Sequence, residues 1–364
     1  MIMKYIRIVL FCLMLVSCNN RVDDELLTIA VNVEKDDFPL IKEKIVIDEI
    51  IQLDDSIPIG NIRKVIFHKF DFFVLNKSQD EILCFQKDGK LKFRIFSKGR
   101  GPKEYVSIQN FLIDKYTDEL LILSSDNKVL RYSCSSGDFL DVITQEGSSL
   151  VLDGIRLSKE MFAWYHMGPD FNLQIQRNGQ TKSYIPFVEV RDMVFAEKAF
   201  TGNKDYSLFV HGTSNYVYKI YEDTLTPQYY VDFGVYKVPE QLYESPQQAI
   251  GIFEKQDVAT KLDYISVNNN FFGFSYLFFP QSSFNIQSRY VIYCKESKTS
   301  YNIHSNYLFP VYDIVNDKFL SIVTPSNVLT SDKLIIDRQI LDYIEINKIP
   351  EDANPLIVFW SIKN

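Results

Sequence analysis

The sequence predicts an all-β fold, a six-bladed β-propeller built from four-stranded antiparallel blades. Three observations predict it: a recurring phrase of strands and turns, regularly spaced glycine turns and an abundance of aromatic residues. The 364 residues include 28 Phe and 22 Tyr but only 14 Gly. The chain therefore has ample apolar surface to bury and does not have the composition of a disordered protein.

A phrase of short apolar strands separated by polar turns recurs along the chain. Its copies occupy residues 71–96, 118–143, 161–187 and 206–233. Gly89, Gly137 and Gly179 come from the reversals KDG, SSG and RNG and are spaced by 48 and 42 residues. A period of about 40–50 residues with four strands in each unit is the signature of a propeller.

Each phrase needs an inner strand before it, and the chain offers a candidate in each case. The expected inner strands are Ile62–Lys69, Val106–Asp114, Leu150–Ser158 and, less regularly, Val194–Thr201. A fifth unit follows from Leu262, and a sixth begins at Val311 and uses residues 356–363 as its third strand. The sixth unit lacks an outermost strand. We expect residues 44–53, KIVIDEIIQL, to fill that place and close the ring, which removes an open sheet edge.

Two stretches with helix-like spacing interrupt the strands. Residues 239–261 lie between the fourth and fifth units, and residues 331–347 lie between strands two and three of the sixth unit. Ser331 is a suitable N-cap for the second. In a four-stranded antiparallel blade, the link to the next blade and the second-to-third turn emerge on the same side. Both helical insertions are therefore predicted to decorate one face.

The first 17 residues have the pattern of an export signal. Lys4 and Arg7 precede the apolar run Ile8–Val16, which is too short to span a bilayer. Cys18 follows a small residue, as in the bacterial lipobox, and is the predicted lipidation site. Residues 18–40 are predicted to be a polar tether and residues 41–364 the propeller. This places the protein in the cell envelope, lipid-anchored to the outer membrane and facing the periplasm or the cell surface.

The loop SKGRGPKEY, residues 97–105, links the first unit to the second. We expect positive φ angles at Gly99 and Gly101, with Pro102 directing the chain into the next strand. A phosphate cradle would need a helix after the glycines, whereas VSIQNFLID is strand-like. The loop is therefore interpreted as a structural hinge.

This loop also resembles a phrase found in a known group, the NHL-like and TolB-like six-bladed propeller lipoproteins of Gram-negative bacteria. Their phrase is approximately Gly-x-Gly-Pro-Gly-Glu-Tyr followed by a strand that ends in Asp. The matching residues are Gly99, Gly101, Pro102, Glu104, Tyr105 and Asp114. Lys103 replaces the third glycine, while the closing segment NPLIVFWSIK is similar to that family's terminal strand. The resemblance implies the fold and an exported, lipidated chain, and it implies no activity.

Charge and motifs restrict the function classes. The net charge is −8, with no basic stripe along which nucleic acid could lie, so nucleic acid is excluded as a partner. No cofactor motif is recognised. We expect a binding or scaffold protein that recognises a glycan or a protein partner on one propeller face. The alternative is a hydrolase or lyase with a metal in the central channel, because ligands from separate blades would show no sequence spacing.

A candidate binding rim follows from two histidines in equivalent places. His166 and His211 both end the second strand of their units. Trp164 and Tyr165 precede the first of them. Aromatic rings and neutral imidazoles suit a sugar or peptide ligand. We expect this rim on the face that carries the helical insertions, although two unrelated turn histidines are the alternative.

Three cysteines fall in third-strand segments of different units. Cys84, Cys134 and Cys294 should therefore lie too far apart for disulfides. We expect free thiols that are mostly buried.

Overall fold

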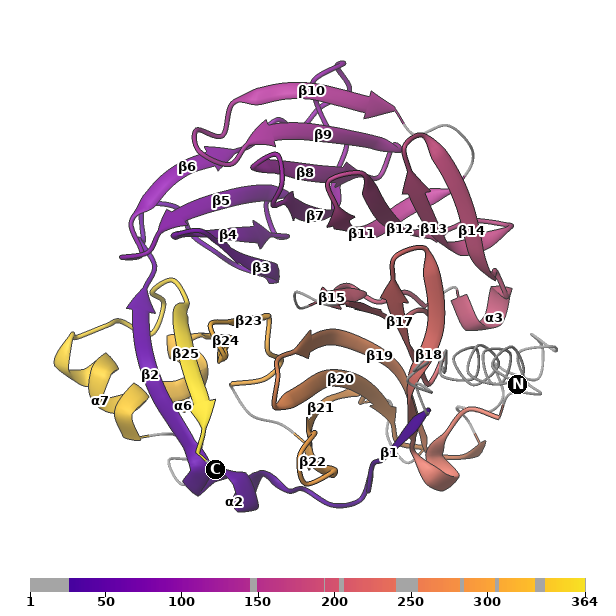
Figure 1. Ribbon diagram of the computed structural model, residues 1–364. Coiled ribbons are helices and arrows are strands. Elements are labelled where there is room, and N and C mark those ends of the chain that lie inside the picture. Colours follow the sequence, from indigo (N-terminus) through magenta and orange to yellow (C-terminus); the bar gives the residue numbers. More distant parts are fainter. Residues whose placement is uncertain are drawn as a thin grey trace, which may run out of the picture.

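The computed structural model is a closed ring of six antiparallel sheets, which confirms the predicted propeller (Figure 1). The structure describes residues 26–144, 149–192, 194–202, 206–239, 255–281, 285–304, 308–330 and 338–363. Within these residues each of the six sheets has the four strands expected of a blade.

The first five blades take their four strands in chain order. Blade one consists of β3 (Ile62–His68), β4 (Asp71–Asn76), β5 (Glu81–Gln86) and β6 (Leu91–Ile95). Blade two consists of β7 (Ile108–Asp114), β8 (Glu119–Ser124), β9 (Lys128–Ser133) and β10 (Phe139–Thr144). Blade three consists of β11 (Leu150–Ser158), β12 (Met161–Met167), β13 (Phe171–Arg177) and β14 (Gln180–Pro186). Blade four contains β15 (Phe200–Gly202), β16 (Ser207–Phe209), β17 (Tyr216–Tyr221) and β18 (Thr224–Asp232), and blade five contains β19 (Val258–Val267), β20 (Phe271–Phe279), β21 (Gln287–Cys294) and β22 (Thr299–Ile303).

Blade six joins the two ends of the chain, as predicted. It contains β23 (Asp313–Val315), β24 (Lys318–Val323), β25 (Leu356–Ile362) and, outermost, β2 (Ile45–Gln52). β2 pairs antiparallel with β25 from Ile45 opposite Ile362 to Gln52 opposite Leu356. The ring is thus closed by backbone hydrogen bonds between strands about 300 residues apart in sequence.

The turns between third and fourth strands explain the glycine period. Gly89, Gly137 and Gly179 have φ angles of 85°, 75° and 78°. A residue with a Cβ adopts such angles only with strain, so glycine is favoured at this point of each hairpin. The spacing of these glycines therefore reports the blade repeat directly.

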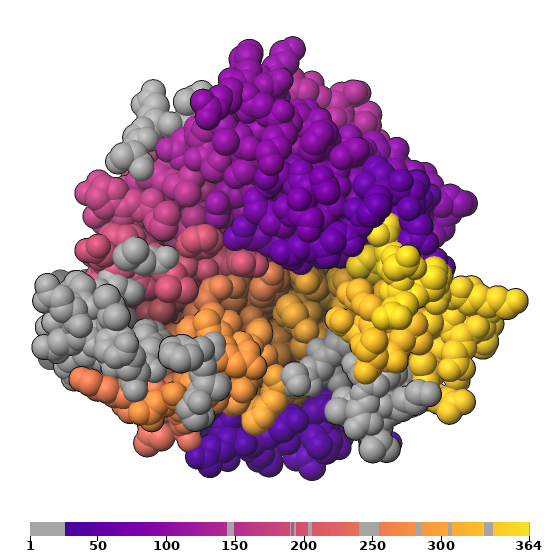
Figure 2. Space-filling view, turned by 180° about the vertical axis from the view of Figure 1, so that it is seen from behind, coloured from indigo at the N-terminus to yellow at the C-terminus, as the bar shows by residue number. Residues whose placement is uncertain are grey.

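The segment before β2 packs on the body instead of forming a tether, which corrects the expected boundary at residue 40. β1 (Leu27–Ala30) adds a fifth, parallel strand to blade four by pairing with β18. The chain then crosses the outside of blade five before the short helices α2 (Phe38–Ile41) and η1 (Lys42–Lys44) lead into β2. Figures 1 and 2 both show this indigo segment along the outside of orange blade five. We call residues 27–41 the belt.

Side chains of blade five hold the belt in place. Arg289 donates a 2.6 Å hydrogen bond to the Val33 carbonyl, and the Asn302 side-chain amide donates to the carbonyls of Asn32 and Lys35. Five apolar belt residues are buried: Ile29, Val31, Val33, Phe38 and Ile41. The low hydrophobic periodicity of this segment predicted an unpacked tether. The packing was not predicted because a segment that crosses the outside of a blade needs no regular alternation of apolar and polar residues.

The helical insertions are described in part. α6 (Pro325–Thr330) and α7 (Arg338–Ile346) lie between β24 and β25, and α7 buries Ile340 and Ile344 against the core of blades five and six. Most of the first expected insertion, residues 240–254, lies outside the described residues, as do residues 331–337. Two short elements, α3 (Glu189–Asp192) and η2 (Gly234–Tyr236), lie in the links on either side of blade four. Among the described helices none is long and apolar enough to cross a membrane.

The inner strand of blade four is shorter than expected. Of the expected strand Val194–Thr201, only Phe200 and Thr201 pair in a sheet, as part of β15 (Phe200–Gly202). The backbone amides of Glu197 and Lys198 instead donate to the Asp263 carboxylate at 2.8 and 2.9 Å. These two amides bond to a side chain of the neighbouring blade five, so this segment does not extend β15.

Candidate functional site

A cleft of about 370 Å³ lies between blades two and three, on the side of the short first-to-second and third-to-fourth turns. We call it the inter-blade cleft. Its lining comprises Asp114, Thr117, Glu119, Leu121, Arg131, Ile143, Arg156, Glu160, Phe162, Trp164, Gln176, Asn178 and Gly179. The helical insertions belong to connections on the opposite side of the ring, because antiparallel strands place alternate turns on alternate faces.

Aromatic rings form the floor of the inter-blade cleft. Phe162 and Trp164 are two residues apart on β12, so they share one side of the strand. Their rings stack with centroids 4.1 Å apart and an 11° interplanar angle. Gly154 on β11 makes room, because a Cβ there would lie 2.7 Å from the indole ring. Gly154, opposite Trp164, thus leaves the space that the indole ring occupies.

Charged side chains form the walls. Glu119 accepts two 2.7 Å hydrogen bonds from Arg131, a bidentate pair that raises the pKa of the arginine. The Arg156 guanidinium lies 5.4 Å from the Phe162 ring centroid, and its Nε is 3.7 Å from the Asp114 carboxylate. That Nε makes no hydrogen bond with any described residue. The walls therefore combine a bidentate ion pair with a guanidinium whose Nε is buried beside the Asp114 carboxylate.

The expected binding rim is not a surface feature. Trp164, Tyr165, His166 and His211 are 6, 0, 5 and 1% exposed. Trp164 contributes to the cleft floor, but the hydroxyl of Tyr165 faces the other way and accepts a hydrogen bond from the Gly212 amide. His166 lies near the end of β12, but His211 lies two residues beyond β16. The burial of both side chains depends on the neighbouring sheets, which the sequence pattern does not show.

The two rim histidines have different surroundings. His166 packs edge-on against Phe171, and burial lowers the pKa of its imidazole to about 4. His211 Nδ1 lies 3.0 Å from Asp192, which also accepts 2.8 Å hydrogen bonds from Asn172 and the Val188 amide. Burial opposes ionisation of Asp192, but the hydrogen bonds from His211 and Arg191 outweigh it and hold its pKa well below the usual range.

The loop at residues 97–105 links β6 to β7, as predicted, but its glycines serve a different purpose. Neither Gly99 nor Gly101 has a positive φ, which corrects that expectation. A Cβ on Gly99 would lie 2.0 Å from the Glu104 carboxylate. That carboxylate accepts a 2.7 Å hydrogen bond from the Gly101 amide. The absence of a Cβ at these two glycines therefore leaves room for the Glu104 carboxylate against the backbone.

The other residues of the loop phrase also have structural contacts. Tyr105 is fully buried, and its hydroxyl donates to the Asp80 carbonyl at 2.8 Å and accepts from the Ser97 amide at 3.2 Å. Asp114 accepts a 2.9 Å hydrogen bond from the Tyr116 amide and so caps the turn after β7. Pro102 lies within the loop turn between Gly101 and Glu104. The phrase thus organises one junction between blades.

The central channel contains a polar network to which every blade contributes. Its members are Lys64, Asn110, Asp153, Lys198, Asp263 and Asp313. The Lys64 ammonium bonds the Asp153 carboxylate at 2.9 Å, and the second oxygen of Asp153 accepts from the Ala199 amide. Burial lowers the pKa of Lys198, while the nearby Asp313 carboxylate opposes that shift. The channel carboxylates thus already accept hydrogen bonds or form ion pairs with ammonium groups and backbone amides.

The predicted lipidation site, Cys18, lies outside the described residues. Cys84, Cys134 and Cys294 are free thiols, which confirms the expectation from their blade positions. The first two are buried and the third is half-buried.

Solved structures support the fold assignment. A crystal structure of a "putative exported protein" from Bacteroides fragilis is 14% identical, with a TM-score of 0.75, and the match covers 93% of this chain and all of that one. A DUF4221 family member from Bacteroides vulgatus is 8% identical, with a TM-score of 0.55 and coverage of 88% and 98%. No curated protein matches the chain.

The sequence itself matches one protein family over residues 49–361, described as a domain of unknown function, DUF4934. This range contains all six blades apart from the first residues of the closing strand β2 and the last residue of β25. The propeller part of the sequence resemblance is confirmed, while its lipoprotein and NHL-like parts stay predictions. Because the match spans most of its length, the chain belongs to the DUF4934 family.

Proposed function

We propose that the protein is an extracytoplasmic, lipid-anchored binding protein that takes a glycan into the inter-blade cleft. The main support is the lining of this cleft, which combines an aromatic floor with polar walls. Phe162 and Trp164 form the floor, and the polar walls include Arg156, Glu160 and Gln176. Sugars offer apolar C–H faces together with hydroxyl groups, so such a cleft suits them. The export signal and Cys18 supply the proposed location.

The alternative, a hydrolase or lyase with a metal in the channel, is less well supported. Asp153 and Asp263 are the channel carboxylates nearest to ammonium groups, at 2.9 Å from Lys64 and 3.1 Å from Lys261. A metal ion would have to displace these cations and the backbone amides bonded to the same carboxylates. A binding role requires no such rearrangement.

Screening the purified protein on a glycan array, followed by calorimetry with the best ligand, tests the proposal. Gln176 and Arg177 are adjacent, exposed residues of β13 that point to opposite sides of the strand. Gln176→Trp should fill the cleft and abolish binding, whereas Arg177→Ala should bind as wild type. Arg156→Gln should weaken binding about tenfold, the loss of roughly one charged hydrogen bond. Failure of every glycan to bind, or equal affinity in Gln176→Trp, would refute the proposal.

A protein partner is the second candidate, supported by a groove between α7 and β2. This groove encloses about 410 Å³ and includes Ile346, which is 77% exposed, beside Tyr343. Asp48, Glu49 and Asp342 surround these apolar side chains. The groove therefore suits a basic, partly apolar segment of a partner. Capture from detergent-solubilised membranes by wild type but not by Ile346→Asp would support it, whereas equal capture would argue against it.

A further inference from the structure

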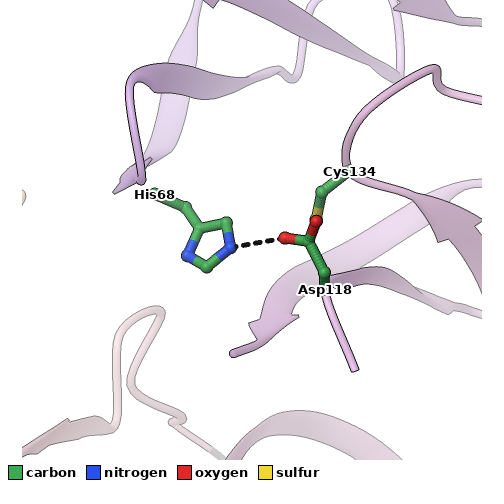
Figure 3. Close-up of side chains that lie close together, drawn as sticks. All are labelled: His68, Asp118 and Cys134. Atoms are coloured by element: carbon green, nitrogen blue, oxygen red, sulfur yellow. Dashed lines mark hydrogen bonds and ion pairs between the residues drawn. The ribbon is translucent and has the colours of Figure 1, made fainter. Parts of the chain in front are cut away.

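Three side chains of metal-ligand type converge at the junction of blades one and two. His68 ends β3, Asp118 precedes β8, and Cys134 follows β9. One ligand atom from each lies within 4.8 Å of the other two. Figure 3 shows the three side chains meeting, with His68 Nε2 and Asp118 Oδ1 separated by 2.7 Å.

The local backbone holds this arrangement. Asp118 has a φ of 60°, and its amide bonds the Asp114 carbonyl at 2.9 Å. The Cys134 amide in turn donates to the Asp118 carbonyl at 3.2 Å. Two ligand residues of blade two are therefore fixed relative to each other, and His68 approaches them from blade one.

We propose that His68, Asp118 and Cys134 form a binding site for a borderline divalent cation, with Zn²⁺ as the best match. An imidazole nitrogen, a carboxylate oxygen and a thiolate are the donor set that Zn²⁺ takes in proteins. The three protein ligands leave one tetrahedral position for water. The partial exposure of His68 and Asp118, 16% and 35%, gives an ion access from solvent.

Two features set the conditions for binding. Cys134 is buried, and its thiol must release a proton to solvent as the Zn–S bond forms. The Lys69 ammonium lies 2.6 Å from the second oxygen of Asp118 and competes with a cation. Lys69 is 59% exposed and can turn into solvent when the ion arrives. Affinity should therefore rise with pH and fall with competition from this lysine.

Titration of the intact protein with Co²⁺ and Zn²⁺ under reducing conditions tests the site. We expect one Co²⁺ per chain with a thiolate charge-transfer absorption, and displacement of Co²⁺ by Zn²⁺. Cys134→Ser should abolish that absorption, and His68→Gln should weaken Zn²⁺ binding at least tenfold. Cys294→Ser, which changes a thiol of blade five, should bind as wild type.

Lys69 provides a second set of variants that leaves the ligands in place. Lys69→Ala should tighten Zn²⁺ binding by removing the competing cation, whereas Lys90→Ala, which removes a lysine paired with Asp88, should not. Thermal unfolding should show a Zn²⁺-dependent rise in Tm for wild type and Lys69→Ala. Absence of the thiolate absorption, or Zn²⁺ affinity unchanged in both His68→Gln and Cys134→Ser, would overturn the proposal.

Discussion

The buried imidazole of His166 predicts how stability depends on pH. Its pKa falls from 6.5 in the unfolded chain to about 4 in the fold because burial disfavours the charged ring. Below pH 6.5 the unfolded state binds a proton that the folded state does not, so stability is complete above pH 6.5 and is lost as the pH falls toward 4. The loss should reach about 3 kcal/mol. Chemical denaturation between pH 7 and 4 should show a smaller decrease in the free energy of unfolding for His166→Leu than for wild type. If the two proteins lose the same free energy over this range, His166 is not the source of the acid sensitivity.

Tyr105 tests whether the loop at residues 97–105 is structural. Tyr105→Phe keeps the ring but leaves the Asp80 carbonyl and the Ser97 amide without their buried partner. We expect a loss of about 1–3 kcal/mol in the free energy of unfolding. Glycan affinity should be unchanged, because the loop lies on the other face from the inter-blade cleft. Unchanged stability with lost binding would make the loop part of a site.

The belt contributes to the stability of the folded body. Deleting residues 1–25 removes none of the described elements, whereas deleting residues 1–44 removes β1, α2 and five buried apolar side chains. Each such side chain contributes about 1.5–3 kcal/mol when fully buried, so the longer deletion should cost several kcal/mol. Thermal unfolding of the two truncated proteins measures this difference. Equal melting temperatures of the two truncated proteins would support the predicted boundary between tether and propeller at residue 40.

Strands were more predictable than contacts between blades. β11 occupies the expected residues 150–158, and β2 closes blade six as expected, because period, alternation and glycine turns are local signals. The belt was missed because its hydrogen bonds come from Arg289 and Asn302, more than 250 residues away. The triad of His68, Asp118 and Cys134 was missed for the same reason, since His68 and Asp118 are 50 residues apart and meet only when two blades pack.

At the scale of the whole molecule, Cys18 predicts the protein's attachment to the membrane. Cys18→Ala should prevent acylation and release the chain from the membrane fraction, because two or three acyl chains are needed for stable anchoring. Fractionation of cells expressing wild type and Cys18→Ala, with a high-salt wash, measures the change. Continued sedimentation of the variant with membranes would contradict the lipoprotein prediction.

The proposed function requires that the ligand binds between blades two and three, on the face of the short turns. Hydrogen–deuterium exchange of the intact protein, with and without the best glycan from the array, tests this claim most directly. We expect slower exchange in residues 114–119, 156–160 and 176–179, which line the inter-blade cleft, and no change in the loop 97–105 or in α7. Protection confined to residues 97–105 or to α7, with the cleft segments unchanged, would contradict it.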